Sequence, residues 1–234
     1  MNLIEIRGLK KQYHAKTALN GIDIDIGERD SITVFGPNGA GKTTLLKIIS
    51  GIMSPTEGNA FYNNKKYSES EMKKEVFYLG HKTSLYNALT VGENMDFICR
   101  LFSINHRGES VKNILKEHGL WERRRDPVNE LSQGMKRRLA LAKGFMTDPK
   151  VFILDEPFTG LDLRWRSSIL SKIKDIRSQG KTVILSTHLV EEGFELATRV
   201  AFLHKGRFLF IKKKEEVKIE EIYGLFDSMG ETGK

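Results

Sequence analysis

The chain has 234 residues, of which 39% are hydrophobic and 29% charged, with 21 glycines and five prolines. This composition is typical of a globular domain and excludes a disordered or fibrous protein. Cys99 is the only cysteine, which excludes an intramolecular disulfide and a cysteine-rich metal site. We see neither an apolar secretory signal nor a run near the ~20 apolar residues of a spanning helix, so we expect a soluble, cytosolic protein.

Basic residues exceed acidic ones, which gives the chain a net charge of +8 and an isoelectric point near 9.4. The excess gathers in three clusters, at residues 123–125, 136–138 and 212–214. Such clusters indicate either an ordinary solvated surface or an anionic partner, such as a nucleotide, a nucleic acid or a membrane surface. For the cluster at 136–138 we expect mainly a solvated face.

Strand and helix signals alternate along the chain. Strands are predicted at 3–7, 22–26, 31–35, 76–79, 151–154 and 182–185, with a closing hairpin of 200–203 and 207–211. Helices are predicted after residue 44, repeatedly within 90–146, at 163–177, from 189, and at 213–226 with Val217, Ile222 and Phe226 inward. The alternation predicts a single α/β domain with a mainly parallel core sheet and an antiparallel β edge. We expect residues 1–89 and 147–211 to form the core, 90–146 an inserted helical subdomain and 212–234 a C-terminal tail.

A glycine-rich segment lies between the predicted strand at 31–35 and the helix that follows. It fits the pattern G-x-x-x-x-G-K-[ST] and comprises Gly36, Pro37, Asn38, Gly39, Ala40, Gly41, Lys42, Thr43 and Thr44. Glycines allow backbone N–H groups to surround phosphate oxygens, and the helix N-terminus adds a positive dipole. Lys42 would reach the β- and γ-phosphates and the Thr43 hydroxyl would bind Mg²⁺. The alternative, a glycine-rich turn with a solvated lysine, does not account for the flanking strand and helix. The fold predicted is that of a P-loop NTPase.

The buried-strand pattern at 151–154 ends in two carboxylates, Asp155 and Glu156. These side chains must emerge at the carboxyl end of the strand, where α/β sheets bind ligands. Asp155 is the candidate Mg²⁺ ligand, and Glu156 is the candidate general base for a water in line with the γ-phosphate. A pair of charges in a turn before Pro157 is the simpler alternative.

Leu131–Met135 precedes a helical stripe of Met135, Leu139, Ala142 and Met146, which we interpret as core packing. Ser132 fits the N-cap of that helix, and capping alone would explain a serine there. Together with Gly134, it also fits a second phosphate site at a helix N-terminus. One chain needs one phosphate cradle, so the second would serve a nucleotide held by another subunit.

His188 follows the predicted strand at 182–185, on the same sheet edge as Asp155. A histidine in this place is usually a structural residue. Beside a phosphate site, it becomes a candidate contact for the γ-phosphate.

Together these residues resemble the ATP-binding subunits of ABC transporters, over about residues 3–211. Gly36–Thr44 resembles Walker A, Val151–Asp155 Walker B with Glu156 as the catalytic glutamate, Leu131–Met135 the signature, Gly160–Asp162 the D-loop and His188 the switch histidine. Tyr13 is similar to the aromatic residue that stacks on adenine.

The resemblance implies a head-to-tail dimer with two ATP molecules between the subunits, most simply a homodimer. Lys42, Thr43 and Asp155 of one subunit would face Ser132 and Gly134 of the other. ATP and Mg²⁺ are the implied ligands, and a separate transmembrane permease subunit is the implied partner. The chain would then lie on the cytoplasmic face of the membrane, and no nucleic acid is expected.

Two positions depart from the family pattern. His81 stands where a glutamine usually contacts Mg²⁺ and water, and its imidazole would make that contact sensitive to pH. The signature reads LSQGM, so Met135 cannot donate a hydrogen bond as a glutamine would. Both changes concern the contacts to the partner subunits rather than the phosphate site.

Three segments are similar to the haem-exporter ATPases of cytochrome c maturation, the subfamily we favour from sequence: Tyr78–His81 with its Gly80–His81 pair, Leu89–Asn94 and Leu154–Asp162. The short segment after Ile211 also fits that subfamily. The LSQGM segment followed by Lys-Arg-Arg is similar to ATPases of multidrug, lipid or polysaccharide exporters, and these are the main competing assignment. A non-transport cytosolic ABC ATPase, an ABC-type ATPase acting on nucleic acid and a small P-loop kinase are also considered. The nucleic-acid ATPase would need a coiled-coil insertion or tandem cassettes, and the kinase would have no use for Ser132 and His188.

Overall fold

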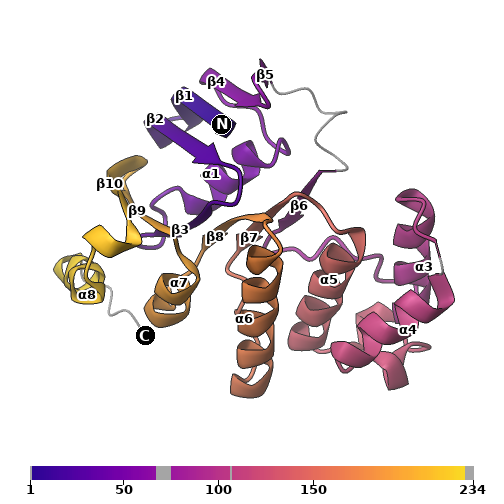
Figure 1. Ribbon diagram of the computed structural model, residues 1–234. Helices are drawn as coiled ribbons and strands as arrows, with labels where there is room; N and C mark the ends of the chain where they lie inside the picture. The colour runs from indigo at the N-terminus through magenta and orange to yellow at the C-terminus, as the bar shows by residue number, and fades with distance from the viewer. Residues whose placement is uncertain (1, 67–74, 106, 230–234) are drawn as a thin grey trace.

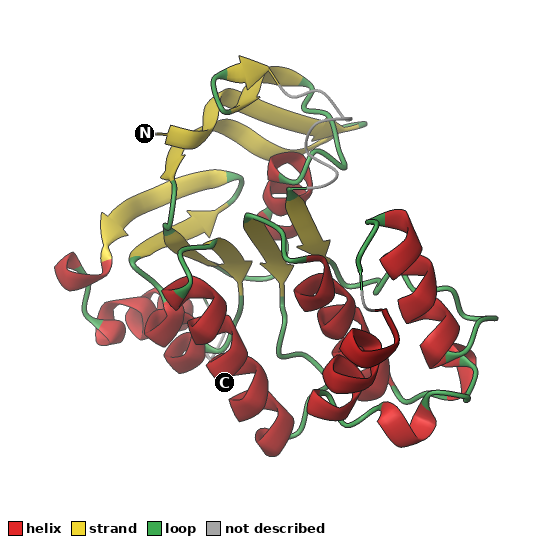
Figure 2. Ribbon diagram, turned by 45° about the vertical axis from the view of Figure 1, so that its right-hand side comes forward, coloured by secondary structure: helices red, strands yellow, loops and turns green. Residues whose placement is uncertain are grey.

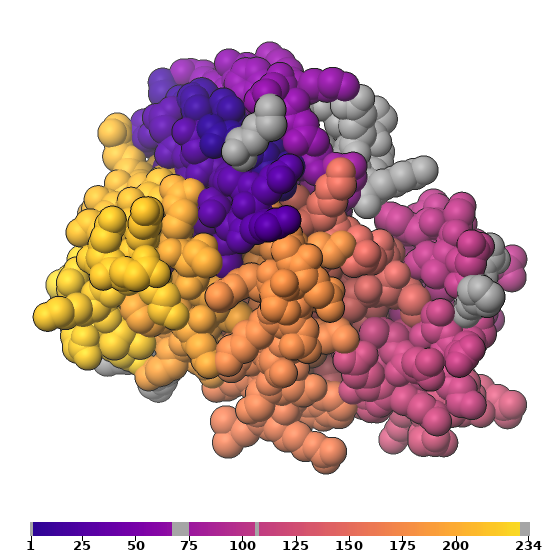
Figure 3. Space-filling model, viewed as in Figure 1, coloured from indigo at the N-terminus to yellow at the C-terminus, as the bar shows by residue number. Residues whose placement is uncertain are grey.

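The computed structural model describes residues 2–66, 75–105 and 107–229. Two sheets lie one above the other with helix α1 between them, and the other helices cover the far face of the larger sheet or extend to one side (Figures 1 and 2). In the space-filling view the helical region around α3 and α4 projects from the body at the lower right (Figure 3). No helix within the described ranges is both long and apolar enough to cross a membrane.

The larger sheet has six strands in the order β10-β9-β3-β8-β7-β6. The strands are β3 (Ser31–Phe35), β6 (Val76–Leu79), β7 (Val151–Asp155), β8 (Thr182–Ser186), β9 (Arg199–His204) and β10 (Arg207–Lys213). All neighbours are parallel except the hairpin of β9 and β10. Every residue of β3, β7 and β8 is buried, as expected where helices or a second sheet cover both faces. The predicted α/β class and mainly parallel sheet are confirmed.

The smaller sheet is antiparallel, in the order β2-β1-β4-β5. It comprises β1 (Asn2–Tyr13), β2 (Lys16–Gly27), β4 (Glu57–Tyr62) and β5 (Lys65–Lys66). Strands β1 and β2 are much longer than the sequence predicts. Their pairing continues across several β-bulges, beyond the residues in which apolar and polar side chains alternate. Strands β4 and β5 are not predicted from sequence, since polar and small residues there conceal the period of two.

Helix α1 (Lys42–Ile49) packs between the two sheets and contacts β1 and β2 on one side and β7 and β8 on the other. Leu45, Leu46, Ile48 and Ile49 are buried in this core. A helix that is apolar around most of its circumference is expected where both of its sides are covered. Because α1 follows β3 through a short loop, its N-terminal end lies at the carboxyl edge of the larger sheet.

The inserted region contains α3 (Val91–Leu101), α4 (Arg107–Glu117), the 3₁₀ turns Trp121–Arg123 and Val128–Glu130, and α5 (Gln133–Thr147). Leu139 and Ala142 of α5 are buried against this region, with Met135 and Met146 partly buried beside them, so the predicted core stripe is confirmed. Ala140 and Leu141 are buried on another side of the same helix, in the core under the large sheet. Helix α5 therefore joins the helical region to the sheet.

The C-terminal third adds α6 (Leu163–Ser178), α7 (Val190–Leu196), the 3₁₀ turn Lys214–Glu216 and α8 (Ile219–Ser228). The sequence pattern starts the last helix too early, because β10 continues through Lys213 and delays α8 to Ile219. Val217, Ile222 and Phe226 are buried as predicted, against β3 and β9.

Candidate functional site

Two positions in the loop between β3 and α1 accept only glycine. Gly36 has φ +146°, and a Cβ there would lie 2.1 Å from the Leu203 carbonyl oxygen. Gly41 has φ +109°, and a Cβ there would lie 2.5 Å from the carbonyl oxygen of Ala18. Neighbouring strands thus press the loop into place, and any side chain at these positions would displace it.

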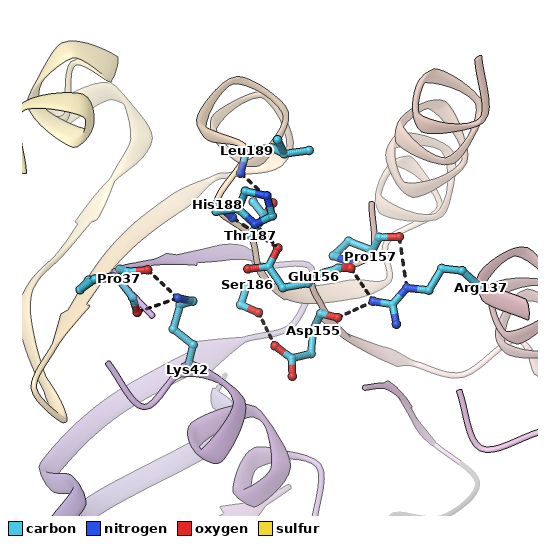
Figure 4. A network of polar contacts seen from close by, with 11 residues as sticks. Pro37, Lys42, Arg137, Asp155, Glu156, Pro157, Ser186, Thr187, His188 and Leu189 are labelled. Carbon is cyan, nitrogen blue, oxygen red and sulfur yellow. Dashed lines mark hydrogen bonds and ion pairs between the residues drawn. The ribbon is translucent and has the colours of Figure 1, made fainter. Parts of the chain in front are cut away.

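Lys42 begins α1 and folds back across the loop. Its Nζ donates hydrogen bonds to the carbonyl oxygens of Gly36, at 2.5 Å, and of Pro37, at 3.0 Å (Figure 4). The N-cap of α1 is Gly41, which makes no side-chain capping bond. No capping side chain therefore covers the first N–H groups of the helix. An ammonium group beside an open helix N-terminus is a site for a phosphate anion.

Asp155 ends β7 and is 1% exposed. One carboxylate oxygen accepts a hydrogen bond from the Ser186 hydroxyl at 2.6 Å, and the other lies 3.4 Å from the Tyr78 hydroxyl. Burial and the nearby Asp155 carboxylate raise the pKa of Tyr78, so its phenol stays protonated and donates. Strands β6 and β8 thus orient the carboxylate from both sides.

Glu156 adopts a left-handed backbone conformation, with φ +52°. This costs about 1–3 kcal/mol for a residue with a side chain, and such strain is concentrated at functional sites. The carboxylate Oε2 lies 2.8 Å from Nδ1 of His188, at the end of β8 (Figure 4). The hydrogen bond to Glu156 raises the pKa of His188 above its ordinary value, against an opposing effect of partial burial.

A cavity of about 510 Å³ brings most of the predicted residues together. It is lined by Gly36, Asn38, Gly39, Ala40, Gly41, Lys42, Thr43 and Thr44 of the loop, by Asp155, Glu156 and His188, and by Tyr13, Lys16, Ala18, His81 and Thr159. Pro37 is not among the lining residues, and its carbonyl oxygen accepts hydrogen bonds from Lys42 Nζ and the Ala40 N–H. Tyr13 is 41% exposed, and its hydroxyl lies 2.9 Å from Sδ of Met53, which leaves a ring accessible for stacking.

The residues of this cavity fit a magnesium ion that is held partly by phosphate. Thr43 and Asp155 supply a hydroxyl and a carboxylate, the hard oxygen ligands that Mg²⁺ prefers. No group of three or more His, Cys, Asp or Glu side chains suited to a metal ion occurs in the described part of the chain. This donor set matches an ion that takes its remaining ligands from water and a nucleotide, with His81 exposed at the edge of the cavity.

Ser132 and Gly134 are not brought to this cavity. Ser132 is the N-cap of α5, where its hydroxyl accepts a hydrogen bond from the Met135 N–H at 3.2 Å. Gly134 packs so closely on the Gly160 carbonyl oxygen that a Cβ would lie 2.6 Å from it. The predicted cap is confirmed, and Ser132 is exposed to solvent.

The expectation of a solvated face at 136–138 is wrong for two of its three residues. Arg137 is 5% exposed and donates hydrogen bonds to four backbone carbonyl oxygens around Glu156 and Gly80. The Arg138 guanidinium lies 4.0 Å over the ring of Trp165 and donates to the His118 carbonyl oxygen. The sequence does contain a pattern that indicates the burial of Arg137. With Gly134, Leu141 and Gly144 it forms a second helical stripe, which faces the sheet.

Comparisons with known proteins agree with this geometry. The sequence profile of the ABC transporter family matches residues 19–159. A lantibiotic transport ATP-binding protein of Streptococcus pyogenes is 30% identical, over 94% of this chain and 96% of its own length. A linearmycin resistance ATP-binding protein of Bacillus subtilis is 31% identical, over 92% of this chain and 70% of its own length. Further relatives are named for spermidine and putrescine import.

Among solved structures, a dimeric ATP-binding cassette in a post-hydrolysis state with ADP and phosphate has a TM-score of 0.82. It is 25% identical, over 90% of this chain and 98% of that chain. The profile covers more than half of the sequence, and the relatives extend the similarity over nearly all of it. The chain belongs to the ABC transporter family, as an ATP-binding subunit that hydrolyses ATP.

Proposed function

We propose that this chain is the ATPase of an exporter and drives transport through a separate transmembrane subunit. The observation that carries the proposal is the arrangement in one cavity of a phosphate loop, a buried carboxylate and the Glu156–His188 pair. These groups are the ones that phosphoryl transfer to water requires.

Within the site, Lys42 and the loop N–H groups hold the β- and γ-phosphates, and Tyr13 stacks on the adenine. Thr43 and Asp155, with His81 at the edge of the cavity, would hold Mg²⁺, which would supply positive charge to offset that of the phosphates. Glu156 accepts the proton of the attacking water, and His188 orients Glu156 and contacts the γ-phosphate.

The chain acts as a homodimer in which the exposed start of α5 closes the site of the second copy. Ser132 and Gly134 supply N–H groups and a hydroxyl to the phosphate of the partner's ATP. Their position outside this chain's own cavity, and the dimeric state of the similar cassette, support this assignment.

A permease binds the chain at the cytoplasmic face of the membrane, on the helical region. The support is an exposed apolar patch of Tyr86, Phe97 and Leu101, in which the rings of Tyr86 and Phe97 lie edge to face at 4.9 Å. Large apolar side chains gathered on a surface are typical of an interaction site. Tyr86 belongs to the segment that follows His81, which links this patch to the nucleotide cavity.

For the cargo we propose an amphipathic peptide or a drug-like compound. The support is the pair of relatives named for lantibiotic transport and linearmycin resistance, the first of which has nearly the same length as this chain. The haem-exporter assignment rests on the Gly80–His81 pair, and neither of these relatives is named for haem export. The multidrug-type assignment is therefore the better supported of the two.

The test is a pull-down of tagged Glu156→Gln protein from native membranes with ATP and Mg²⁺, with Phe97→Asp in the same background as the control. Loss of the base should trap the closed dimer with its permease attached, and the Phe97 variant should recover the dimer without it. Recovery of haem-handling membrane proteins would favour the haem-exporter assignment. A trapped dimer with no membrane protein would mean a cytosolic ATPase and would remove the transport proposal.

A further inference from the structure

Arg137 lies in the second turn of α5 and points into the space below the carboxyl ends of β6 and β7. Its Nη1 donates to the Gly80 carbonyl oxygen at 2.6 Å, and its Nη2 donates to those of Asp155 and Glu156, both at 2.5 Å. Its Nε approaches the Pro157 carbonyl oxygen at 3.4 Å (Figure 4). The guanidinium thus contacts the backbone of three successive residues in the turn that carries Glu156.

The buried Arg137 guanidinium lies near the carboxylates of Asp155 and Glu156, which favour its charge, without a direct ion pair to either. None of the carboxylates that the structure describes forms an ion pair with Arg137, and the acceptors of its hydrogen bonds are all backbone oxygens. Burial lowers the pKa of Arg137 to about 10, against the opposing effect of the Asp155 and Glu156 carboxylates. A buried guanidinium charge of this kind depends on the backbone carbonyl oxygens around it staying in place.

The backbone that Arg137 holds is the strained part of the site. The peptide N–H of Glu156 donates to the Ser186 carbonyl oxygen at 3.0 Å, while its own carbonyl accepts from Arg137. Both ends of a residue with positive φ are therefore fixed, and the Glu156 side chain is directed toward His188. Arg137 also donates a hydrogen bond to the carbonyl oxygen of Gly80, the residue before His81.

We propose that Arg137 is a positioning residue, which holds Glu156 in the geometry for proton abstraction and links that geometry to the start of α5 at Ser132. The proposal rests on the function proposed above, in which Glu156 is the base. Because α5 carries the residues that meet the partner's ATP, closure of the dimer and alignment of the base would share one rigid connection. A chain without the contacts of Arg137 would bind ATP normally and hydrolyse it slowly, because its base would be out of alignment.

The neighbouring Arg138 is a matched control. It lies on the same helix, is partly buried, stacks its guanidinium on the ring of Trp165 and donates one hydrogen bond to the His118 carbonyl oxygen. None of these contacts involves the turn of Glu156. Replacing Arg138 removes a similar amount of packing from α5 and leaves the catalytic turn untouched.

The experiment compares Arg137→Gln, Arg137→Lys and Arg138→Gln in the full chain, in the native and in the Glu156→Gln background. Single-turnover hydrolysis and ATP affinity are measured for each, with melting temperature as the check of folding. We expect Arg137→Gln to lower the hydrolysis rate about tenfold or more with ATP affinity changed less than about twofold, which is the signature of lost alignment. Arg137→Lys should recover part of the rate, and Arg138→Gln should keep it.

The Glu156→Gln background separates positioning from general damage. If Arg137 acts through Glu156, its replacement should cost nothing more once the base is gone. An equal loss in both backgrounds, or a native rate in Arg137→Gln, would overturn the positioning role. If Arg137→Gln does not fold, Arg137→Lys carries the same comparison. A native rate in Glu156→Gln alone would instead refute the proposed base and leave the contacts of Arg137 without this use.

Discussion

Two helices of this molecule begin with N–H groups suited to an anion, and they differ in what surrounds them. The start of α1 has a glycine N-cap without a capping side chain, a lysine folded across it and two carboxylates in the same cavity. The start of α5 is capped by the Ser132 hydroxyl and is exposed, away from that cavity. The start of α1 thus lies in a cavity with a lysine and two carboxylates, and the start of α5 lies outside it.

The difference shows that a helix N-terminus becomes a reaction site only through what the fold places beside it. The dipole and the first N–H groups are common to both helices and favour an anion at each. Within the described residues, the carboxylates of Asp155 and Glu156 share a cavity with the start of α1, and Ser132 at the start of α5 lies outside that cavity. In the proposed function the second helix therefore serves a site in another chain, and each helix start is one half of a composite site.

The largest expected effect is that of removing the base from the α1 site. Glu156→Gln should lower kcat by about 10²- to 10⁴-fold, the usual contribution of a general base. ATP binding should persist, because Lys42 and the loop are unchanged. Steady-state ATPase rates and ATP affinity measure the two effects separately. Glu57→Gln, an exposed glutamate paired with Lys10, is the control and should retain full activity.

The next effect concerns the ammonium group at the same helix start. Lys42→Ala should weaken ATP binding about 10- to 100-fold, since a charge-assisted hydrogen bond contributes about 1.5–3 kcal/mol. Isothermal titration with ATP measures the change. Lys47→Ala, at the other end of α1, removes the same charge from the same helix. Equal losses in the two variants would contradict the assignment of Lys42 to the phosphates.

A smaller effect is expected at the start of α5. Ser132→Asp keeps a good N-cap, so the melting temperature should hold, but it places a negative charge where the partner's phosphate is proposed to bind. ATPase activity should fall several-fold to tenfold, which is about the effect of losing one hydrogen bond to the phosphate. Ser132→Ala removes the cap together with the hydroxyl proposed to contact the phosphate, adds no charge, and should lower stability by about 1 kcal/mol. Full activity in Ser132→Asp would mean that this helix start meets no phosphate.

The smallest effect is the pH dependence of the Glu156–His188 pair. Because the pKa of His188 is raised in the folded chain, the pair stabilises the fold fully below the ordinary pKa of 6.5 and loses this contribution as pH rises through the folded value. The His188 side chain is 54% exposed, so the gain is below about 1 kcal/mol. The melting temperature of His188→Gln should lie below native at about pH 6 and coincide with it at about pH 9. A constant difference across this range would contradict the ion pair.

Much of the α1 site could be predicted from sequence, because its residues are adjacent in the chain or end apolar strands. The glycine spacing of Gly36–Thr44 and the strand before Asp155 define the loop and the carboxylate without tertiary information. Their common edge follows from the rule that parallel strands end together. The cap at Ser132 is likewise local, since it depends on one residue and the helix that follows.

The contacts that depend on long-range packing could not be predicted in the same way. Three consecutive basic residues indicate a surface and so place Arg137 in solvent, while the small residues around it allow α5 to approach the sheet. The Glu156–His188 bond and the positive φ of Glu156 require the ends of β7 and β8 to be placed in space. Both arise between segments about thirty residues apart.

The composite site is tested most directly by mixing two impaired chains, at an ATP concentration too low to saturate Lys42→Ala. Lys42→Ala lacks the α1 half and Ser132→Asp the α5 half, so a mixed dimer retains one site with both halves intact. We expect that mixing the two variants with ATP and Mg²⁺ restores ATPase activity well above that of either variant alone. Activity that stays at the average of the separate variants, in samples where mixed dimers are shown to form, would contradict the account.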